Sequence, residues 1–136
     1  MDATPTPLSV DLSACVALGR PQVVAVACSG GRDSMALLHA TVHAALKAPG
    51  IQVVALHVHH GLSPRADQWW AHVADQVAVW RALGWPVDFR GRRLSGAPRS
   101  GDSVEAWARA GRYEALREMA QEAVSYTHLR AHETSL

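Results

Sequence analysis

Two short apolar runs, each followed by a stretch with helical periodicity, constrain this sequence more than any other feature. Residues 23–28 (VVAVAC) and 51–58 (IQVVALHV) are continuous, rich in β-branched residues and bounded by Pro and Gly. Runs of this kind are typical of strands buried on both faces of a parallel sheet. Between them, apolar residues three and four positions apart predict a helix over Asp33–Lys47, which Pro49 and Gly50 end.

The same alternation continues along the rest of the chain. Ser63-Pro64 predicts an N-cap and first helical residue, and the helix is expected to reach about Leu83. Asp102 and Glu105 predict a capping box at the start of the last helix. The remaining expected segments are a short helix at 8–18, a weak strand at 87–90, a loop at 91–101 and a last helix at 102–123. This pattern predicts an α/β fold with a doubly wound, Rossmann-like parallel sheet.

Composition excludes several classes of protein. Thirteen Lys and Arg against twelve Asp and Glu give a net charge of +1, which favours no partner of either sign. Cys15 and Cys28 form no CxxC pair, so a disulfide scaffold and a cysteine-rich metal site are excluded. No apolar run approaches the roughly 20 residues that span a bilayer. We therefore expect a cytoplasmic protein without membrane contact.

Residues 29–34 (SGGRDS) form the most informative loop, between the first strand and its helix. Gly30 and Gly31 allow a sharp turn whose N–H groups, with the helix dipole, bind an anion. The hydroxyls of Ser29 and Ser34 can donate to phosphate oxygens, and Arg32 lies in the same phosphate-binding segment. Asp33 beside a phosphate suggests a bridging Mg²⁺. The alternative is a plain tight turn in which Asp33 caps the helix.

This loop resembles the PP-loop of the N-type ATP pyrophosphatases, which split ATP between its α- and β-phosphates. It lacks the GxxxxGK[ST] and GxGxxG patterns of other nucleotide-binding loops. Two further segments resemble the tRNA(Ile)-lysidine synthase family. Residues 56–63 (LHVHHGLS) are similar to its H-V-[N/D]-H-G-L stretch, with His59 in place of Asn or Asp, and residues 103–113 (SVEAWARAGRY) to its S-x-E-x-x-A-R-x-x-R-Y helix.

The resemblance implies a reaction and its participants. ATP adenylates the C2 oxygen of the wobble cytidine of tRNA(Ile) with a CAU anticodon, and the amine of L-lysine then displaces AMP. Asp33 would bind Mg²⁺ through the phosphates, and Arg109 and Arg112 would act with it as catalytic residues. The nucleotide would be bound by Ser29, Gly30, Gly31, Arg32, Asp33, Ser34 and His57.

The arginines and histidines allow more than one interpretation. Residues 81–117 contain eight Arg and four acidic residues, which suits a tRNA-facing surface and equally a solvated loop and helix. His57 and His59 are expected to face opposite sides of the sheet. Their rings, with that of His60, are expected to pack or hydrogen-bond rather than bind a metal, because no carboxylate or Cys is spaced to complete a site.

The resemblance stops at Ala123, where the family continues with a fourth strand. We therefore expect 1–123 to be a partial PP-loop ATP-binding domain, truncated after about three strands, and 124–136 to be a foreign tail. The family's strand order, 3-2-1-4-5, leaves the first strand as a bare apolar edge, which favours self-association. Weak ATP binding and no lysidine formation by this chain are expected.

Other functions remain open at this point. Another PP-loop enzyme, such as a tRNA thiolase or an amide-forming ligase, shares the SGGxDS loop. Thiolases generally carry catalytic cysteines, and only Cys15 and Cys28 are present here. A non-catalytic nucleotide-binding module of the universal-stress type is the alternative from another class. It would be expected to have a glycine-rich motif late in the chain, where residues 102–136 contain only Gly111.

Overall fold

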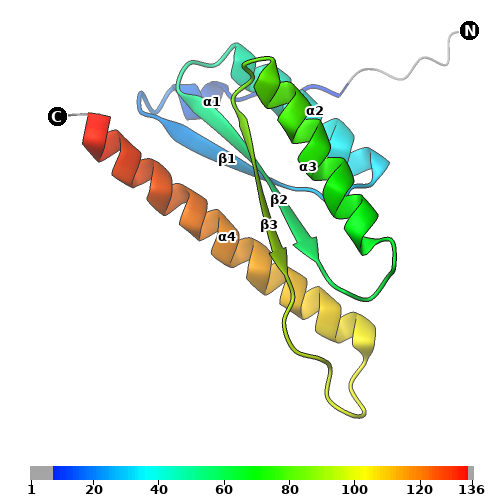
Figure 1. Ribbon diagram of the computed structural model, residues 1–136. Coiled ribbons are helices and arrows are strands. Elements are labelled where there is room, and N and C mark those ends of the chain that lie inside the picture. Colours follow the sequence, from blue (N-terminus) through cyan, green and yellow to red (C-terminus); the bar gives the residue numbers. More distant parts are fainter. Residues whose placement is uncertain (1–7, 135–136) are drawn as a thin grey trace, which may run out of the picture.

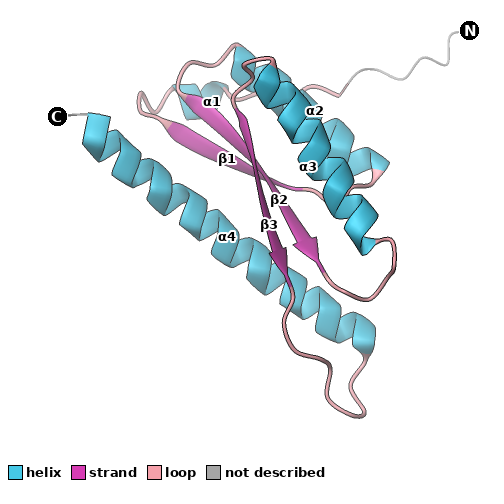
Figure 2. Cartoon of the chain, in the orientation of Figure 1, coloured by secondary structure: helices cyan, strands magenta, loops and turns pink. Residues whose placement is uncertain are grey.

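Strands and helices alternate along the chain as the apolar pattern predicts (Figures 1 and 2). The computed structural model describes residues 8–134, and their side chains up to Ala123. The elements are α1 (Ser13–Val16), β1 (Gln22–Ala27), α2 (Arg32–Leu46), β2 (Ile51–His59), α3 (Ala66–Ala82), β3 (Val87–Arg93) and α4 (Val104–Thr134).

The three strands form one parallel sheet in the order β1-β2-β3. Val24 pairs with Val53 across the first ladder, and Val53 pairs with Val87 across the second. The central position of β2 explains why eight of its nine residues are buried, whereas β1 is only partly covered. Among the described residues no strand pairs with the outer side of β1. Self-association through this edge remains a prediction.

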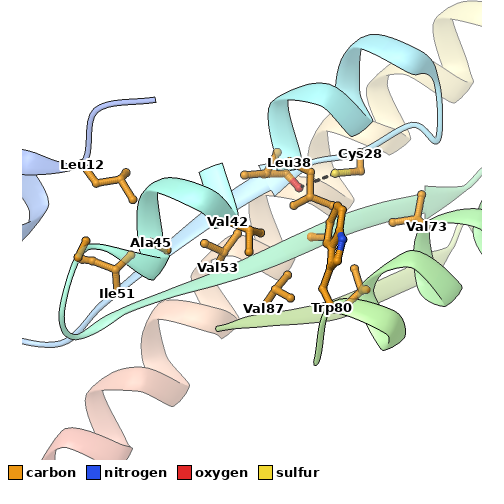
Figure 3. Close-up of a cluster of buried hydrophobic side chains, with 14 residues drawn as sticks. Leu12, Cys28, Leu38, Val42, Ala45, Ile51, Val53, Val73, Trp80 and Val87 are labelled. Carbon is orange, nitrogen blue, oxygen red and sulfur yellow. Dashed lines mark hydrogen bonds between the residues drawn. The ribbon is translucent and has the colours of Figure 1, made fainter. Parts of the chain in front are cut away.

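Helices cover both faces of the sheet, which confirms the doubly wound α/β arrangement (Figure 1). On one face, Val53 and Ala55 of β2 pack with residues of α2 and α3, including Leu38 and Val73 (Figure 3). On the other face, Val54, Leu56 and Val58 pack against α4. Alternate side chains of one strand therefore supply two separate cores.

The third strand is longer than predicted. It continues past Arg90 because Gly91, Arg92 and Arg93 pair with the carboxyl end of β2. The guanidinium of Arg92 also bonds to Glu118 and Glu122 of α4, both at 2.7 Å, which joins the end of the strand to the helix. The expected loop at 91–101 therefore begins only after Arg93. A strand end made of glycine and half-buried or exposed arginines gives no apolar pattern to detect.

Several helix ends differ from the sequence predictions. Ser103, not Asp102, caps α4: its Oγ accepts the N–H of Ala106 at 3.3 Å, and the Asp102 carboxylate accepts the N–H of Arg99 instead. The first helix is a single turn, and α3 begins at Ala66. No helix in the described part of the chain is long and apolar enough to cross a membrane.

The last helix, α4, continues beyond Ala123 to Thr134. The expected end of the helix at 123 is therefore wrong. The foreign origin of residues 124–136 stays a prediction, and the last two of these residues lie outside the described part of the chain.

Candidate functional site

A cavity of about 410 Å³ opens at the carboxyl ends of β1 and β2. This is the edge at which ligands bind in open parallel α/β sheets. Its wall comes from the β1–α2 loop, the end of β2, the start of α3 and one face of α4. The lining residues are Ala27, Cys28, Ser29, Gly31, Ser34, Leu56, His57, Val58, His60, Ala66, Trp69, Arg112 and Leu116.

The β1–α2 loop turns at Gly30, whose φ of +92° is in the region that favours glycine. A Cβ at this position would lie 3.2 Å from Cβ and 3.3 Å from the carbonyl oxygen of Trp69, so a side chain here would also crowd the backbone of α3. Within the loop, Ser29 Oγ accepts the N–H of Gly31 at 3.2 Å, and Ser34 Oγ donates to the Gly31 carbonyl at 3.1 Å. Both predicted hydroxyls thus hold the loop's shape.

The start of α2 has no side-chain cap. Gly31 occupies the N-cap position with extended backbone, and no side-chain cap hydrogen bond forms to the first turn of the helix. The interpretation of Asp33 as the helix cap is therefore wrong; Asp33 lies in the first turn and is exposed. An uncapped helix start presents N–H groups and the positive end of the helix dipole, which together bind anions.

His57 is buried in the cavity wall, with 3% of its surface exposed. Its Nδ1 lies 2.6 Å from the carbonyl oxygen of Cys28, at the end of β1. Burial lowers the pKa of His57; the bond to Cys28 opposes this effect, and the nearby charges of His59, His60 and Arg112 add to it. The ring is therefore neutral at pH 7.

The prediction that His57 and His59 face opposite sides of the sheet is wrong. Residues two apart in a strand share a face, and both rings lie edge-on to Trp70, at centroid distances of 5.8 and 6.2 Å. His59 Nε2 is 2.7 Å from an Asp67 carboxylate oxygen, and Arg93 Nη1 is 3.4 Å from the same nitrogen. Within the described residues no group of three or more His, Cys, Asp or Glu could hold a metal ion.

The two predicted arginines of α4 differ in position. Arg112 lines the cavity, whereas Arg109, one turn earlier and exposed, does not. Leu116, one turn after Arg112, completes the α4 side of the wall. Gly30, Arg32 and Asp33 belong to the predicted phosphate-binding loop but do not line the cavity itself.

Sequence reasoning missed the contribution of α3. Trp69 and Ala66 line the cavity, and the Trp69 ring lies 6.0 Å from that of His60. Trp69 is 37% exposed, although tryptophan is usually a packing residue. The available signal was its position in the first turn after the loop that follows β2, at the binding edge of the sheet.

Cys28 also lines the cavity, and its environment determines its reactivity. The thiol is buried and donates to the Val26 carbonyl at 3.5 Å. Burial raises its pKa to about 12. A thiol with so high a pKa is almost entirely protonated at neutral pH and is a poor nucleophile.

Comparison with known proteins identifies the family of this chain. A family described as the PP-loop domain matches residues 8–135. The chain is also similar to proteins named tRNA(Ile)-lysidine synthase: 45% identical over 125 residues to that of Ralstonia nicotianae, 43% over 100 residues to that of Chromobacterium violaceum and 47% over 96 residues to that of Burkholderia mallei. These matches cover 90%, 74% and 71% of this chain, but only 26%, 22% and 18% of the relatives. Because the family matches nearly the whole length of the chain, and the structure has an uncapped glycine turn on a parallel α/β sheet, the chain belongs to the PP-loop domain family.

Proposed function

We propose that this chain binds ATP in the cavity, with the phosphates at the β1–α2 loop. The observation that carries the proposal is the uncapped start of α2 directly after the turn at Gly30. Its N–H groups suit a polyphosphate, and a cavity of about 410 Å³ lies in the range usual for small ligands. The family match supports ATP as the nucleotide.

We further propose that the domain serves lysidine formation in the cytoplasm. In this reaction ATP adenylates the wobble cytidine of tRNA(Ile) with a CAU anticodon, and lysine then displaces AMP. The names of the relatives and the three matching segments support this assignment. Arg112 borders the cavity, where its guanidinium suits the α-phosphate. Arg109, which is exposed and outside the cavity, is our proposed contact to the tRNA backbone.

Asp33 is our proposed contact for Mg²⁺. Its exposed carboxylate, in the first turn of α2, is the acidic group of the phosphate-binding loop. No cluster of three protein ligands exists among the described residues, so the ion would take its other ligands from phosphates and water, as Mg²⁺ commonly does. Bound there, it would offset the charge that develops on the pyrophosphate leaving group.

The thiolase alternative is disfavoured by Cys28. A sulfur-transferring enzyme needs a reactive thiolate, and burial raises the pKa of this thiol to about 12. The other described cysteine, Cys15, is outside the cavity lining. An amide-forming ligase of the same family would have the same ATP site, and only the acceptor would distinguish it.

Calorimetric titration with ATP, with and without Mg²⁺, tests the nucleotide assignment. We expect Asp33→Ala to lower ATP affinity at least tenfold with Mg²⁺ and little in EDTA. Asp75→Ala, which removes a carboxylate from the middle of α3, is the matched control and should change neither value. Absence of ATP binding by the unsubstituted chain, or an Asp33→Ala loss that is equal in EDTA, would contradict the assignment.

A ligation assay tests the proposed reaction. Radiolabelled lysine is incubated with ATP, Mg²⁺ and a tRNA(Ile) transcript carrying a CAU anticodon, and the label on the tRNA is measured. We propose that this chain alone forms no lysidine, because it spans about a quarter or less of the relatives' length. Labelled tRNA in a single turnover would refute that proposal. A longer protein that includes these residues should label the tRNA, and its Asp33→Ala variant should not.

A further inference from the structure

His57 is a buried polar side chain that forms part of the cavity wall while using only one of its two ring nitrogens. Its Nδ1 lies 2.6 Å from the Cys28 carbonyl oxygen. A carbonyl oxygen can only accept, so Nδ1 must carry a proton. In a neutral ring this leaves Nε2 without a proton, as a hydrogen-bond acceptor.

The Nε2 atom is not completely enclosed by the protein. No fully buried side-chain nitrogen or oxygen among the described residues lacks a partner. The hydrogen bond of the His57 ring goes through Nδ1 alone, so Nε2 must retain accessible surface. Because the residue as a whole is only 3% exposed and borders the cavity, that surface opens on the cavity.

Because Nε2 of His57 is a hydrogen-bond acceptor, it can bond only to a part of the ligand that carries a donor. Phosphate oxygens are acceptors and cannot bond to an unprotonated nitrogen. The nucleoside offers donors: the exocyclic amine of adenine and the ribose hydroxyls. We propose that Nε2 of His57 accepts a hydrogen bond from such a donor on the nucleoside of ATP, which makes His57 a specificity-determining residue. This inference rests on the proposed binding of ATP in the same cavity.

Two substitutions test the roles of the two ring nitrogens of His57 separately. His57→Asn keeps an amide N–H near the position of Nδ1, and so the bond to Cys28, but removes the acceptor at Nε2. His57→Gln extends to the position of Nε2 with an amide oxygen. We expect His57→Asn to bind ATP about two- to tenfold more weakly, as for one lost neutral hydrogen bond, and His57→Gln to recover part of the loss. Binding of inorganic pyrophosphate, which has no nucleoside, should be the same in all three proteins.

Nucleotide analogues identify the donor. Purine riboside triphosphate lacks the exocyclic amine, and 2′-deoxy-ATP and 3′-deoxy-ATP each lack one hydroxyl. The unsubstituted chain should bind one of these about two- to tenfold more weakly than ATP, and His57→Asn should bind that analogue and ATP equally. His39→Asn, at an exposed histidine of α2 outside the cavity lining, is the control and should retain the discrimination.

The outcomes distinguish this inference from the function on which it rests. If the unsubstituted chain binds ATP and all three analogues equally, the inference is overturned, whether or not the variants fold. It is also overturned if His57→Asn still discriminates against the same analogue. If the unsubstituted chain binds pyrophosphate but not ATP, or neither of them, both the ATP assignment and the inference fail.

Discussion

Replacement of Gly91 by alanine tests how β3 and α3 pack beside the cavity. Gly91 pairs with His57 in the sheet. A Cβ at Gly91 would lie 2.2, 2.6 and 2.6 Å from three atoms of the Trp70 ring. Carbon atoms in good contact lie about 3.5–4.0 Å apart, so the ring would have to withdraw by more than about 1 Å.

The Trp70 ring has little room to withdraw. Its centroid is 5.4 Å from that of Phe89, and the guanidinium carbon of Arg93 lies 5.6 Å above it. The rings of His57 and His59 lie edge-on to it as well. Overpacking of this kind typically costs about 1–3 kcal/mol. Alanine also has less backbone freedom than glycine in the unfolded chain, which raises the free energy of unfolding by about 0.5–1 kcal/mol.

We therefore expect Gly91→Ala to lower the free energy of unfolding by about 1–2 kcal/mol. For a chain of this size that corresponds to a decrease in Tm of about 3–10 °C. Urea and thermal denaturation followed by far-UV circular dichroism would measure both quantities.

A double-mutant cycle with Trp70→Phe isolates the steric contact. Phenylalanine lacks the far edge of the indole, so Gly91→Ala should cost little in that background. If Gly91→Ala costs as much in the Trp70→Phe background as in the unsubstituted chain, the ring contact is not the cause and the reasoning is refuted.

Three further predictions concern the loop glycine, the cap of α4 and the buried histidine. Gly30→Ala and Gly96→Ala both force alanine to a positive φ (+92° and +82°), and each should lower the stability of the folded protein by about 1–2 kcal/mol. Of the two, only Gly30 also lies against the backbone of another element, so calorimetry should show a loss of ATP affinity for Gly30→Ala alone. Because Ser103 caps α4, Ser103→Ala should destabilise the protein by about 0.5–2 kcal/mol in urea denaturation, and Asp102→Ala by less. A larger loss of stability for Asp102→Ala would show that Asp102 is the cap. The pKa of His57 is lowered in the folded state, mainly by burial, so its contribution to stability is complete above the ordinary value of 6.5 and is lost as the pH falls through the lower folded value. Between pH 7.5 and 5, denaturation should therefore show a smaller loss of stability for His57→Asn than for the unsubstituted chain. Identical losses would exclude this linkage.

Much of the fold could be predicted because its signals are local. The apolar runs at β1 and β2 and the Gly-rich turn at Gly30 depend only on neighbouring residues, and these predictions are confirmed. The end of β3 could not be predicted, because Gly91 to Arg93 become a strand only by pairing with β2. The cap of α4 was misplaced because two adjacent residues, Asp102 and Ser103, both suit an N-cap.

The candidate site, like the fold, could be predicted only in part from the sequence. The glycine-rich β1–α2 loop and the two arginines of α4 could be selected as site candidates from the sequence, but the sequence did not show which of these residues border one cavity. Arg112 does and Arg109 does not, and Trp69 borders it without any motif to mark it. Such selection depends on the packing of α3 and α4 on opposite faces of the sheet, which no local pattern encodes.

By itself, the sequence determined the order of strands and helices and the glycine turn after β1, because periodicity and glycine signals act over a few residues; its motifs also resembled those of the PP-loop family, to which the chain belongs. Only the tertiary structure decided the state of His57. Its ring is buried beside Cys28 and Trp70 in the wall of the cavity, and contacts between distant segments of the chain determine which of its nitrogens carries the proton.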